Sequence, residues 1–292
     1  MPLASMTDLL AAARSGGYAL CYCESWNLES LQAVVEAAEQ LGSPTIAGFN
    51  GGFLRHSSRS KPERLAFYGA LSRALEASAV PVAFLLNETD DLAQIQAGLE
   101  LGFNSIMIES DYLPPEQYRS LVKEVVQLAH GRGVSVEAQI GRLPHGGEKG
   151  HPDGQFTDPK VAGAFVRETG IDALGIAIGN VHILTQGKAA VDLERLAAIR
   201  EQVDVPLVIH GGTGFPPESA RQAIALGVAK FNFGTNLKQT YLAALGQALA
   251  HYSEPMNPHP FLGMGGSQDI LVRAREALKV KVMELIQNYG GR

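Results

Sequence analysis

Residues 206–235 read PLVIHGGTGFPPESARQAIALGVAKFNFGT, and this stretch decides the fold. Two short apolar runs, Pro206–Ile209 and Lys230–Phe233, flank a segment long enough for a helix, and a glycine-containing turn follows each run. Short apolar runs that alternate with helical segments are typical of buried parallel strands. The stretch therefore predicts one strand–helix unit and the strand of the next.

The same alternation extends from about residue 18 to about residue 250. The segments between the runs have helical spacing, as in Leu121, Val125 and Leu128. Counting the two runs quoted above, eight strand–helix units fill this region, which is the number in a closed (β/α)₈ barrel. The other six runs are Tyr18–Cys23, Thr45–Phe49, Pro81–Leu86, Ser105–Ile108, Ser135–Ile140 and Ala173–Ile178.

The alternative is an open, doubly wound sheet, which usually has fewer strands and a GxGxxG turn. The early glycine pair Gly51-Gly52 lacks that spacing. A chain of 292 residues could form two domains, but one barrel of ~250 residues fits as well. We predict an α/β chain that folds as a single-domain TIM barrel over residues 1–292. A short helix over Thr7–Ser15 would plug the barrel bottom, and a helical arm would follow from about residue 255 to 292.

Composition argues against several classes of partner. The chain is 46% hydrophobic and 18% charged, and 30 acidic against 24 basic residues give a net charge of -6, which argues against a nucleic-acid partner. The longest apolar runs are far shorter than a membrane helix, so no membrane partner is expected. Cys21 and Cys23 cannot build a disulfide framework and are expected to be buried thiols rather than a redox pair. A cytoplasmic location is the simplest interpretation.

Two histidines follow neighbouring predicted strands. His182 ends the sixth unit's strand and His210 ends the seventh. In a barrel, side chains at the carboxyl ends of strands point into one mouth, so two imidazoles there can converge. With one carboxylate they would form a divalent metal site with open positions, although each could instead hydrogen-bond only locally.

The turns after the last two strands are rich in glycine and threonine. Backbone N–H groups of such turns and of helix N-termini hold phosphate in this architecture, although glycines also simply permit tight turns. The substrate- and phosphate-binding candidates, together with Gly179 near the end of the sixth strand, are Gly211, Gly212, Thr213, Gly214, Asn232, Gly234 and Thr235.

Residues 141–157, GRLPHGGEKGHPDGQFT, are polar and too long for an ordinary loop after a strand. A lid over the mouth is one interpretation, and a surface loop is the other. On a lid, Glu148 could act as an acid or base, or it could form a solvated pair with Lys149. We expect His145 and His151 to face solvent. Trp26 and Tyr22 either line the mouth or pack in the core.

The chain resembles the class II ketose-bisphosphate aldolases, a family that includes the fructose- and tagatose-bisphosphate enzymes. The resemblance covers nearly the whole chain in order and with similar spacing. The two histidine-containing stretches and the Asn-x-x-Thr stretch carry most of it. The matching stretches are residues 17–20, 27–29, 135–138, 178–182, 208–214 and 230–235.

The resemblance implies a (β/α)₈ barrel in which three histidines hold a zinc ion. That zinc polarises the carbonyl of dihydroxyacetone phosphate and stabilises the enediolate. His182 and His210 match two zinc ligands. Gly211, Thr213, Gly214, Asn232 and Thr235 match positions that hold the phosphate and the ketone. Glu109 and Glu137 match acidic positions near a second metal.

Several positions depart from the family. Where the family has Asp-His, this chain has Asn87-Glu88: Glu88 can still bind a metal, whereas Asn87 can orient a substrate but cannot exchange a proton. Glu24 replaces an asparagine. Lys149 replaces the second acid of the lid, and Ile183 replaces a phosphate-contacting glycine. These changes imply a substrate other than fructose 1,6-bisphosphate.

We therefore predict a metal-dependent aldolase that cleaves or forms a C–C bond in a phosphorylated ketose, with Zn²⁺ as the expected cofactor. Its substrate would be a sugar phosphate or resemble dihydroxyacetone phosphate, and its assembly a homodimer or homotetramer. Asn87, Glu148 and Glu24 are the catalytic candidates; His182, His210 and Glu88 are the metal ligands, and Glu109 and Glu137 are candidates for a second metal. Alternatives are a sugar-phosphate isomerase or epimerase, a non-catalytic relative and a Schiff-base mechanism at Lys149.

The acidic strand ends support a cation. Glu24, Glu88, Glu109 and Glu137 all fall near the carboxyl ends of predicted strands. A mouth that acidic would repel a phosphorylated substrate unless a cation sat in it.

Overall fold

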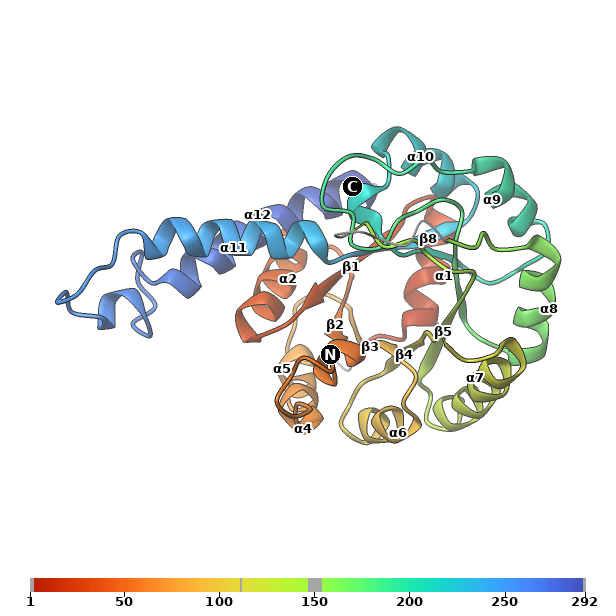
Figure 1. Ribbon diagram of the computed structural model, residues 1–292, viewed down its shortest axis with the longest axis horizontal. Coiled ribbons are helices and arrows are strands. Elements are labelled where there is room, and N and C mark those ends of the chain that lie inside the picture. The colour runs from red at the N-terminus through yellow and green to blue at the C-terminus, as the bar shows by residue number, and fades with distance from the viewer. Residues whose placement is uncertain (1–2, 111, 147–153, 291–292) are drawn as a thin grey trace.

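The computed structural model describes residues 3–110, 112–146 and 154–290 (Figure 1). Eight parallel strands close into a barrel in chain order, with β1 hydrogen-bonded to both β2 and β8. The predicted (β/α)₈ barrel is thus confirmed. The strands are β1 Leu20–Ser25, β2 Thr45–Asn50, β3 Val82–Thr89, β4 Ser105–Ile108, β5 Ser135–Ile140, β6 Ala173–Ile176, β7 Leu207–Ile209 and β8 Val228–Phe233.

Two strands extend further along the chain than the sequence predicts. β1 ends at Ser25 and β3 continues to Thr89, so Glu24, Asn87 and Glu88 lie within strands rather than after them. The register of β3 against β4 shifts between Leu86 and Thr89. Within this irregular segment the side chain of Glu88 faces His182 and His210, whereas the Thr89 hydroxyl bonds to Gln94 in the segment that follows β3.

Helices surround the barrel, and local capping explains where several begin. Asn27 accepts a hydrogen bond from the backbone of Ser30, whose hydroxyl bonds back to the Asn27 backbone, so this capping box starts α2. Asp158 caps α8 just before a proline at its first position. The outer helices are α2 Leu28–Leu41, α3 Gly51–Leu54, α4 Leu65–Gly69, α5 Ser72–Leu75, α6 Leu92–Glu100, α7 Pro115–His130, α8 Pro159–Thr169, α9 Leu193–Arg200 and α10 Pro217–Ala225.

The N-terminal helix α1, Met6–Gly16, closes the amino end of the barrel, as predicted for Thr7–Ser15. Its Met6, Leu10 and Ala13 are completely buried and belong to a small apolar cluster formed with side chains inside the barrel, including Ile46 and Leu85. Burying this apolar surface stabilises the closed end by roughly 25 cal/mol per Å².

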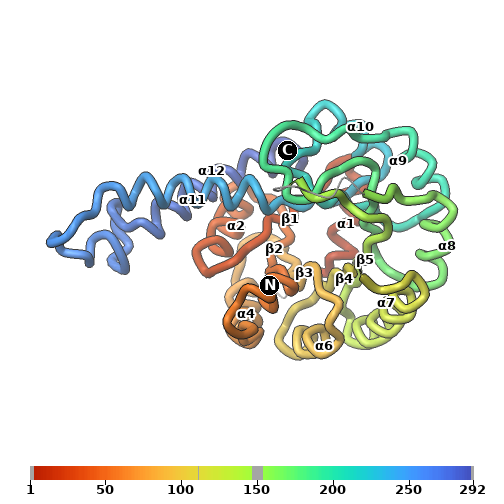
Figure 2. Tube along the Cα trace, viewed as in Figure 1, coloured from red at the N-terminus to blue at the C-terminus, as the bar shows by residue number. Residues whose placement is uncertain are grey.

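The C-terminal arm is larger than predicted. Helix α11, Thr235–Leu249, continues directly from β8, and α12, Ile270–Tyr289, runs back beside it, so the two project together from the barrel (Figures 1 and 2). We expected the arm to begin near residue 255, and α11 belongs to it as well. The far end of α12 returns to the barrel, where Tyr289 packs against Phe231 and Phe233.

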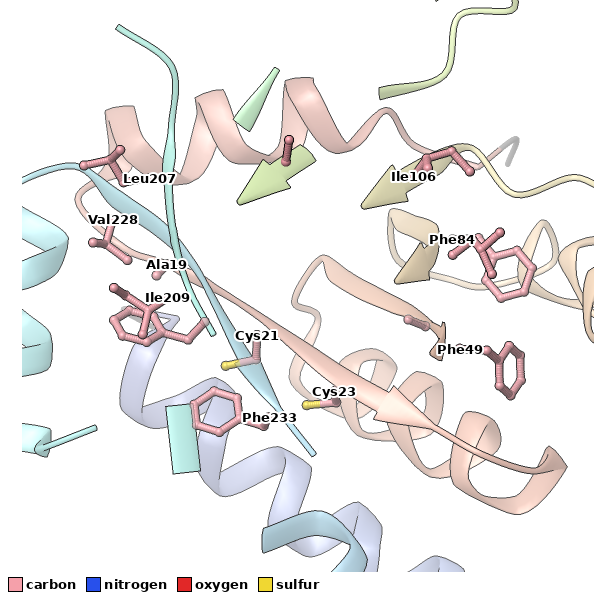
Figure 3. Close-up of a cluster of buried hydrophobic side chains, with 14 of the residues drawn as sticks. Ala19, Cys21, Cys23, Phe49, Phe84, Ile106, Leu207, Ile209, Val228 and Phe233 are labelled. Atoms are coloured by element: carbon pink, nitrogen blue, oxygen red, sulfur yellow. The ribbon is translucent and has the colours of Figure 1, made fainter. Parts of the chain in front are cut away.

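The main core lies between the barrel and its outer helices. Cys21 and Cys23 point into this layer close to Phe233 (Figure 3). Both thiols are free and buried, and burial raises the pKa of the Cys23 thiol to about 12. They are therefore packing residues, as expected. Among the described residues, no helix is long and apolar enough to cross a membrane.

Candidate active site

A cavity of about 260 Å³ opens at the carboxyl ends of the strands. Side chains from β1, β3 and β8 reach it together with the turns after β6 and β7 and the first turns of α11. The lining residues are Tyr22, Glu24, Phe53, Glu88, His182, Ile183, Thr185, Gly211, Thr213, Asn232, Phe233, Gly234, Thr235, Lys238, Gln239 and Leu242.

The three predicted metal ligands converge beside this cavity, whose lining includes Glu88 and His182. One carboxylate oxygen of Glu88, Oε1, lies 3.9 Å from Nε2 of His182 and 3.6 Å from Nδ1 of His210. Glu109 joins them: one ligand atom from each of Glu88, Glu109 and His210 lies within 4.8 Å of the others. The fold thus brings two imidazoles and two carboxylates from four strand ends to one place.

A buried chain of polar contacts fixes the His210 ring. Its Nε2 lies 2.9 Å from Oε1 of Glu137, and the other oxygen of Glu137 accepts a hydrogen bond of 2.7 Å from Nζ of Lys230. All three side chains are almost fully buried. A carboxylate behind a histidine is the arrangement that orients imidazole ligands of metals. Glu137 therefore lies behind His210, whereas Glu109 lies beside the candidate ligands.

The opposite nitrogen of the same ring is open to a further ligand. Nδ1 of His210 is buried and has no hydrogen-bond partner within the described chain. Leaving such an atom unsatisfied costs about 1–3 kcal/mol. Imidazole and carboxylate ligands suit a divalent cation such as zinc. The residues present therefore fit a divalent metal.

Protonation in this cluster follows from its charges. Burial alone would raise the pKa of Glu88, but the imidazoles of His182 and His210 hold it well below its usual range. Burial alone would lower the pKa of His210, but its contacts with Glu137 and Glu88 raise it to about 9. The carboxylates thus favour a positive charge at this point, which either a proton or a cation can supply.

Two asparagines hold Glu88 in place. Nδ2 of Asn87 donates a 2.9 Å hydrogen bond to Oε1 of Glu88, and Asn50 donates to Oε2. Oδ1 of Asn87 is buried and has no hydrogen-bond partner among the described residues, so it keeps an unused acceptor. The backbone of Glu88 has a φ of 52°, a left-handed conformation that non-glycine residues adopt rarely.

Glu24 faces the same cavity and is paired with a residue that the sequence analysis missed. Its Oε1 accepts a hydrogen bond from Nζ of Lys238 in α11, which also lies 4.4 Å from the centre of the Phe53 ring and 5.8 Å from that of Trp26. Burial raises the pKa of Glu24 to about 7, and Lys238 opposes that shift. The signal was present in the sequence, because Lys238 lies one helical turn after Thr235 and so on the same face.

The structure separates the predicted phosphate residues into groups. Gly211, Thr213, Asn232, Gly234 and Thr235 line the cavity. Gly212 and Gly214 line a neighbouring groove, which Thr213 shares.

Gly179 has a packing role. Its φ is +101°, and a Cβ there would lie 2.0 Å from the carbonyl oxygen of Ala190. This close approach gives a reason for glycine that needs no ligand.

The remaining candidates lie at or beyond the edge of the cavity. Glu148, Lys149 and His151 lie outside the described residues. His145 is exposed, and its ring centre is 5.1 Å from that of His182. Tyr22 lines the cavity, whereas Trp26 packs edge-on against Tyr241.

Comparisons with known proteins agree with this geometry. The family model for class II fructose-bisphosphate aldolase matches residues 4–291. A probable fructose-bisphosphate aldolase of Bacillus subtilis (strain 168) is 34% identical over 293 residues, covering 99% of this chain and 98% of the relative.

Solved structures give the same result. The YdjI aldolase of Escherichia coli K12 has a TM-score of 0.79 and 28% identity over 99% of this chain and 97% of its own. A putative fructose-1,6-bisphosphate aldolase of Coccidioides immitis has a TM-score of 0.79 and 27% identity, covering 98% and 96% of the two chains. Fold and sequence therefore agree that this chain is an enzyme of the class II fructose-bisphosphate aldolase family, a group of aldehyde-lyases.

Proposed function

We propose that this enzyme is a metal-dependent aldolase that cleaves or forms a C–C bond in a phosphorylated ketose. One observation carries the proposal: Glu88, His182 and His210 converge beside a cavity, and the buried Nδ1 of His210 is left without a hydrogen-bond partner in the described chain. The relatives named above, which are called aldolases, support the same reaction class.

His182, His210 and Glu88 would hold the cation, for which we propose Zn²⁺, and Glu109 lies next to them. When bound, a divalent ion supplies Lewis-acid polarisation of the ketone carbonyl, which makes the neighbouring C–H or C–C bond easier to break. The phosphate would lie against the backbone N–H groups of the turns at Gly211–Thr213 and Gly234–Thr235, where α11 begins.

Proton transfer is assigned to Glu24. Its pKa of about 7 lets the side chain both accept and donate a proton near neutral pH. Asn87 would orient a hydroxyl or carbonyl of the substrate through its unpartnered oxygen. Because an amide at Asn87 cannot exchange a proton, we propose that fructose 1,6-bisphosphate is not the main substrate. Glu148 stays a prediction.

Metal analysis combined with a cleavage screen over ketose mono- and bisphosphates tests the proposal. We expect stoichiometric divalent metal and cleavage that stops with EDTA and returns with Zn²⁺. Full activity after EDTA would contradict the metal mechanism. Cleavage of fructose 1,6-bisphosphate at ordinary aldolase rates would contradict the role given to Asn87. Interconversion of sugar phosphates without fragments would instead select an isomerase or epimerase, which needs no acid at position 87.

We further propose that the chain self-associates as a dimer or tetramer. The arm carries exposed apolar side chains, including Leu249 of α11 and Val280 of α12, which a second copy could cover. Light scattering should then give a mass of two or four chains. The free thiols of Cys21 and Cys23 support a reducing, cytoplasmic location.

A further inference from the structure

Ile183 lines the cavity in an unusual backbone conformation. Among the described residues, Glu88 and Ile183 are the two non-glycine residues with positive φ, at 52° and 55°, and both line this cavity. A β-branched side chain in the left-handed region is a genuine outlier, which costs about 1–3 kcal/mol and persists only where the surroundings enforce it. Glu88 has a clear reason to be there, because it faces two imidazoles. Ile183 has no polar group to present.

The surroundings hold the Ile183 segment from two sides. On one side, the backbone N–H of His182 donates to the carbonyl of Pro144 at 2.9 Å, and the N–H of Gly146 donates to the carbonyl of His182 at 2.8 Å. On the other side, a Cβ on Gly211 would lie 2.1 Å from the carbonyl oxygen of Val181. The segment is therefore held between the loop after β5 and the turn after β7, which limits how far its backbone can shift.

Ile183 is linked to both proposed halves of the site. It follows His182, a proposed metal ligand, and shares the cavity wall with Gly211 and Thr213, which belong to the proposed phosphate turn. We expect a substrate that uses both halves to bring the atoms that join its carbonyl to its phosphate close to this shared wall. An aliphatic side chain offers those atoms no hydrogen bond, so its effect there is to occupy volume.

We propose that Ile183 is a specificity-determining residue that limits the number of carbons between the carbonyl and the phosphate of the substrate. The inference rests on the proposed function. With isoleucine in place, the site takes a donor half of the dihydroxyacetone phosphate type, with one carbon between these groups. A donor with two carbons there is discriminated against. In a tight pocket, one such carbon is worth about a tenfold to 200-fold difference in kcat/KM.

The test measures exchange of the hydroxymethyl protons next to the carbonyl in D₂O by NMR, which needs no aldehyde partner. Its two donors are dihydroxyacetone phosphate and erythrulose 4-phosphate, which is one carbon longer. We expect the wild type to prefer the shorter donor and both I183A and I183G to reduce that preference by about tenfold or more. I183A removes volume and keeps a Cβ, whereas I183G also relieves the left-handed backbone.

Two controls separate volume from other effects. I183V keeps the β-branched shape and should retain most of the preference. V161A trims an exposed aliphatic residue of α8, outside this cavity, and should leave the ratio unchanged. An equal ratio in wild type, I183A and I183G overturns the inference, and so does a higher Tm in I183G with the wild-type ratio.

The outcome is distinguishable from failure of the proposed function. If the wild type exchanges no protons, the aldolase proposal fails. The preference for the shorter over the longer donor is then measured as the ratio of their dissociation constants, by calorimetry on the metal-loaded protein. A ratio that favours the shorter donor and falls in I183A still supports a volume limit at Ile183. Wild-type protein that binds both donors equally, or neither, overturns it.

Discussion

The two ends of the barrel differ in what their buried side chains do: one end is packed with apolar groups, and the other holds polar groups without partners in the described chain. At the amino end, α1 seals the barrel with fully buried apolar side chains such as Met6 and Leu10. At the carboxyl end, Asn87, His210 and Asn232 keep buried polar atoms without hydrogen-bond partners in the described chain, and Glu88 and Ile183 keep left-handed backbones. The closed end therefore contributes stability, whereas the open end keeps buried polar atoms with which a metal and a substrate can bond.

Removing a proposed metal ligand should give the largest effect, and that effect is on activity. We expect H210A to lose the metal and at least about a thousandfold in kcat/KM, because Lewis-acid stabilisation is worth several kcal/mol. The matched control is H130A, which removes an exposed histidine that pairs with Asp172 on the outer surface. Bound metal is measured by atomic emission and activity by fragment release. An H210A variant that keeps stoichiometric metal and activity would refute the assignment.

The next largest effect is expected at Glu137 and Lys230, the buried pair behind His210. A substitution there should change both stability and metal binding. In E137Q the amide still reaches His210, but Lys230 becomes a buried cation without a counter-ion, which costs about 3–5 kcal/mol of unfolding free energy. Metal affinity should also fall about 10–100-fold, because the ring loses its orienting carboxylate.

The double variant K230M/E137Q separates these effects. It removes the stranded charge, so urea unfolding should show stability regained, while metal titration should still show weakened binding. Recovery of both quantities together would mean that Glu137 acts only through folding.

At the closed end, a substitution should lower stability and leave activity unchanged. L10A removes a completely buried side chain from the plug and should lower the unfolding free energy by about 2–5 kcal/mol. Below its unfolding transition, its kcat/KM should match the wild type, because α1 lies at the other end of the barrel. A changed kcat/KM in fully folded L10A would show that the two ends are coupled.

The smallest expected effect is a shift in pH dependence at the open end. If Glu24 is the base, activity needs its ionised form, so it should be present above pH about 7 and be lost as pH falls through that value. Lys238 lowers this pKa, so K238M should move the acidic limb of the kcat/KM profile to higher pH, and K238R should restore it. A limb at the same pH in E24Q as in wild type would assign the titration to another group.

Local pattern in the sequence was enough for the barrel and for part of the site. The short apolar runs and the helical spacing between them predicted eight strands. Buried parallel strands and amphipathic helices each leave a pattern of apolar residues within a few positions of one another. The positions of His182 and His210 after consecutive strands also predicted their convergence, since parallel strands end on one side. The plug helix was predicted to within one residue at each end.

The tertiary structure alone decided which polar groups act together. Lys230 and Glu137 lie 93 positions apart, and Lys238 and Glu24 lie 214 apart, so no local pattern links them. Glu109 and Glu137 look alike in sequence as acids at neighbouring strand ends. Closure of the barrel, however, puts one beside the candidate ligands and the other behind His210. The left-handed backbone of Ile183 depends likewise on loops that clamp it from two sides, because backbone strain is set by contacts distant in sequence.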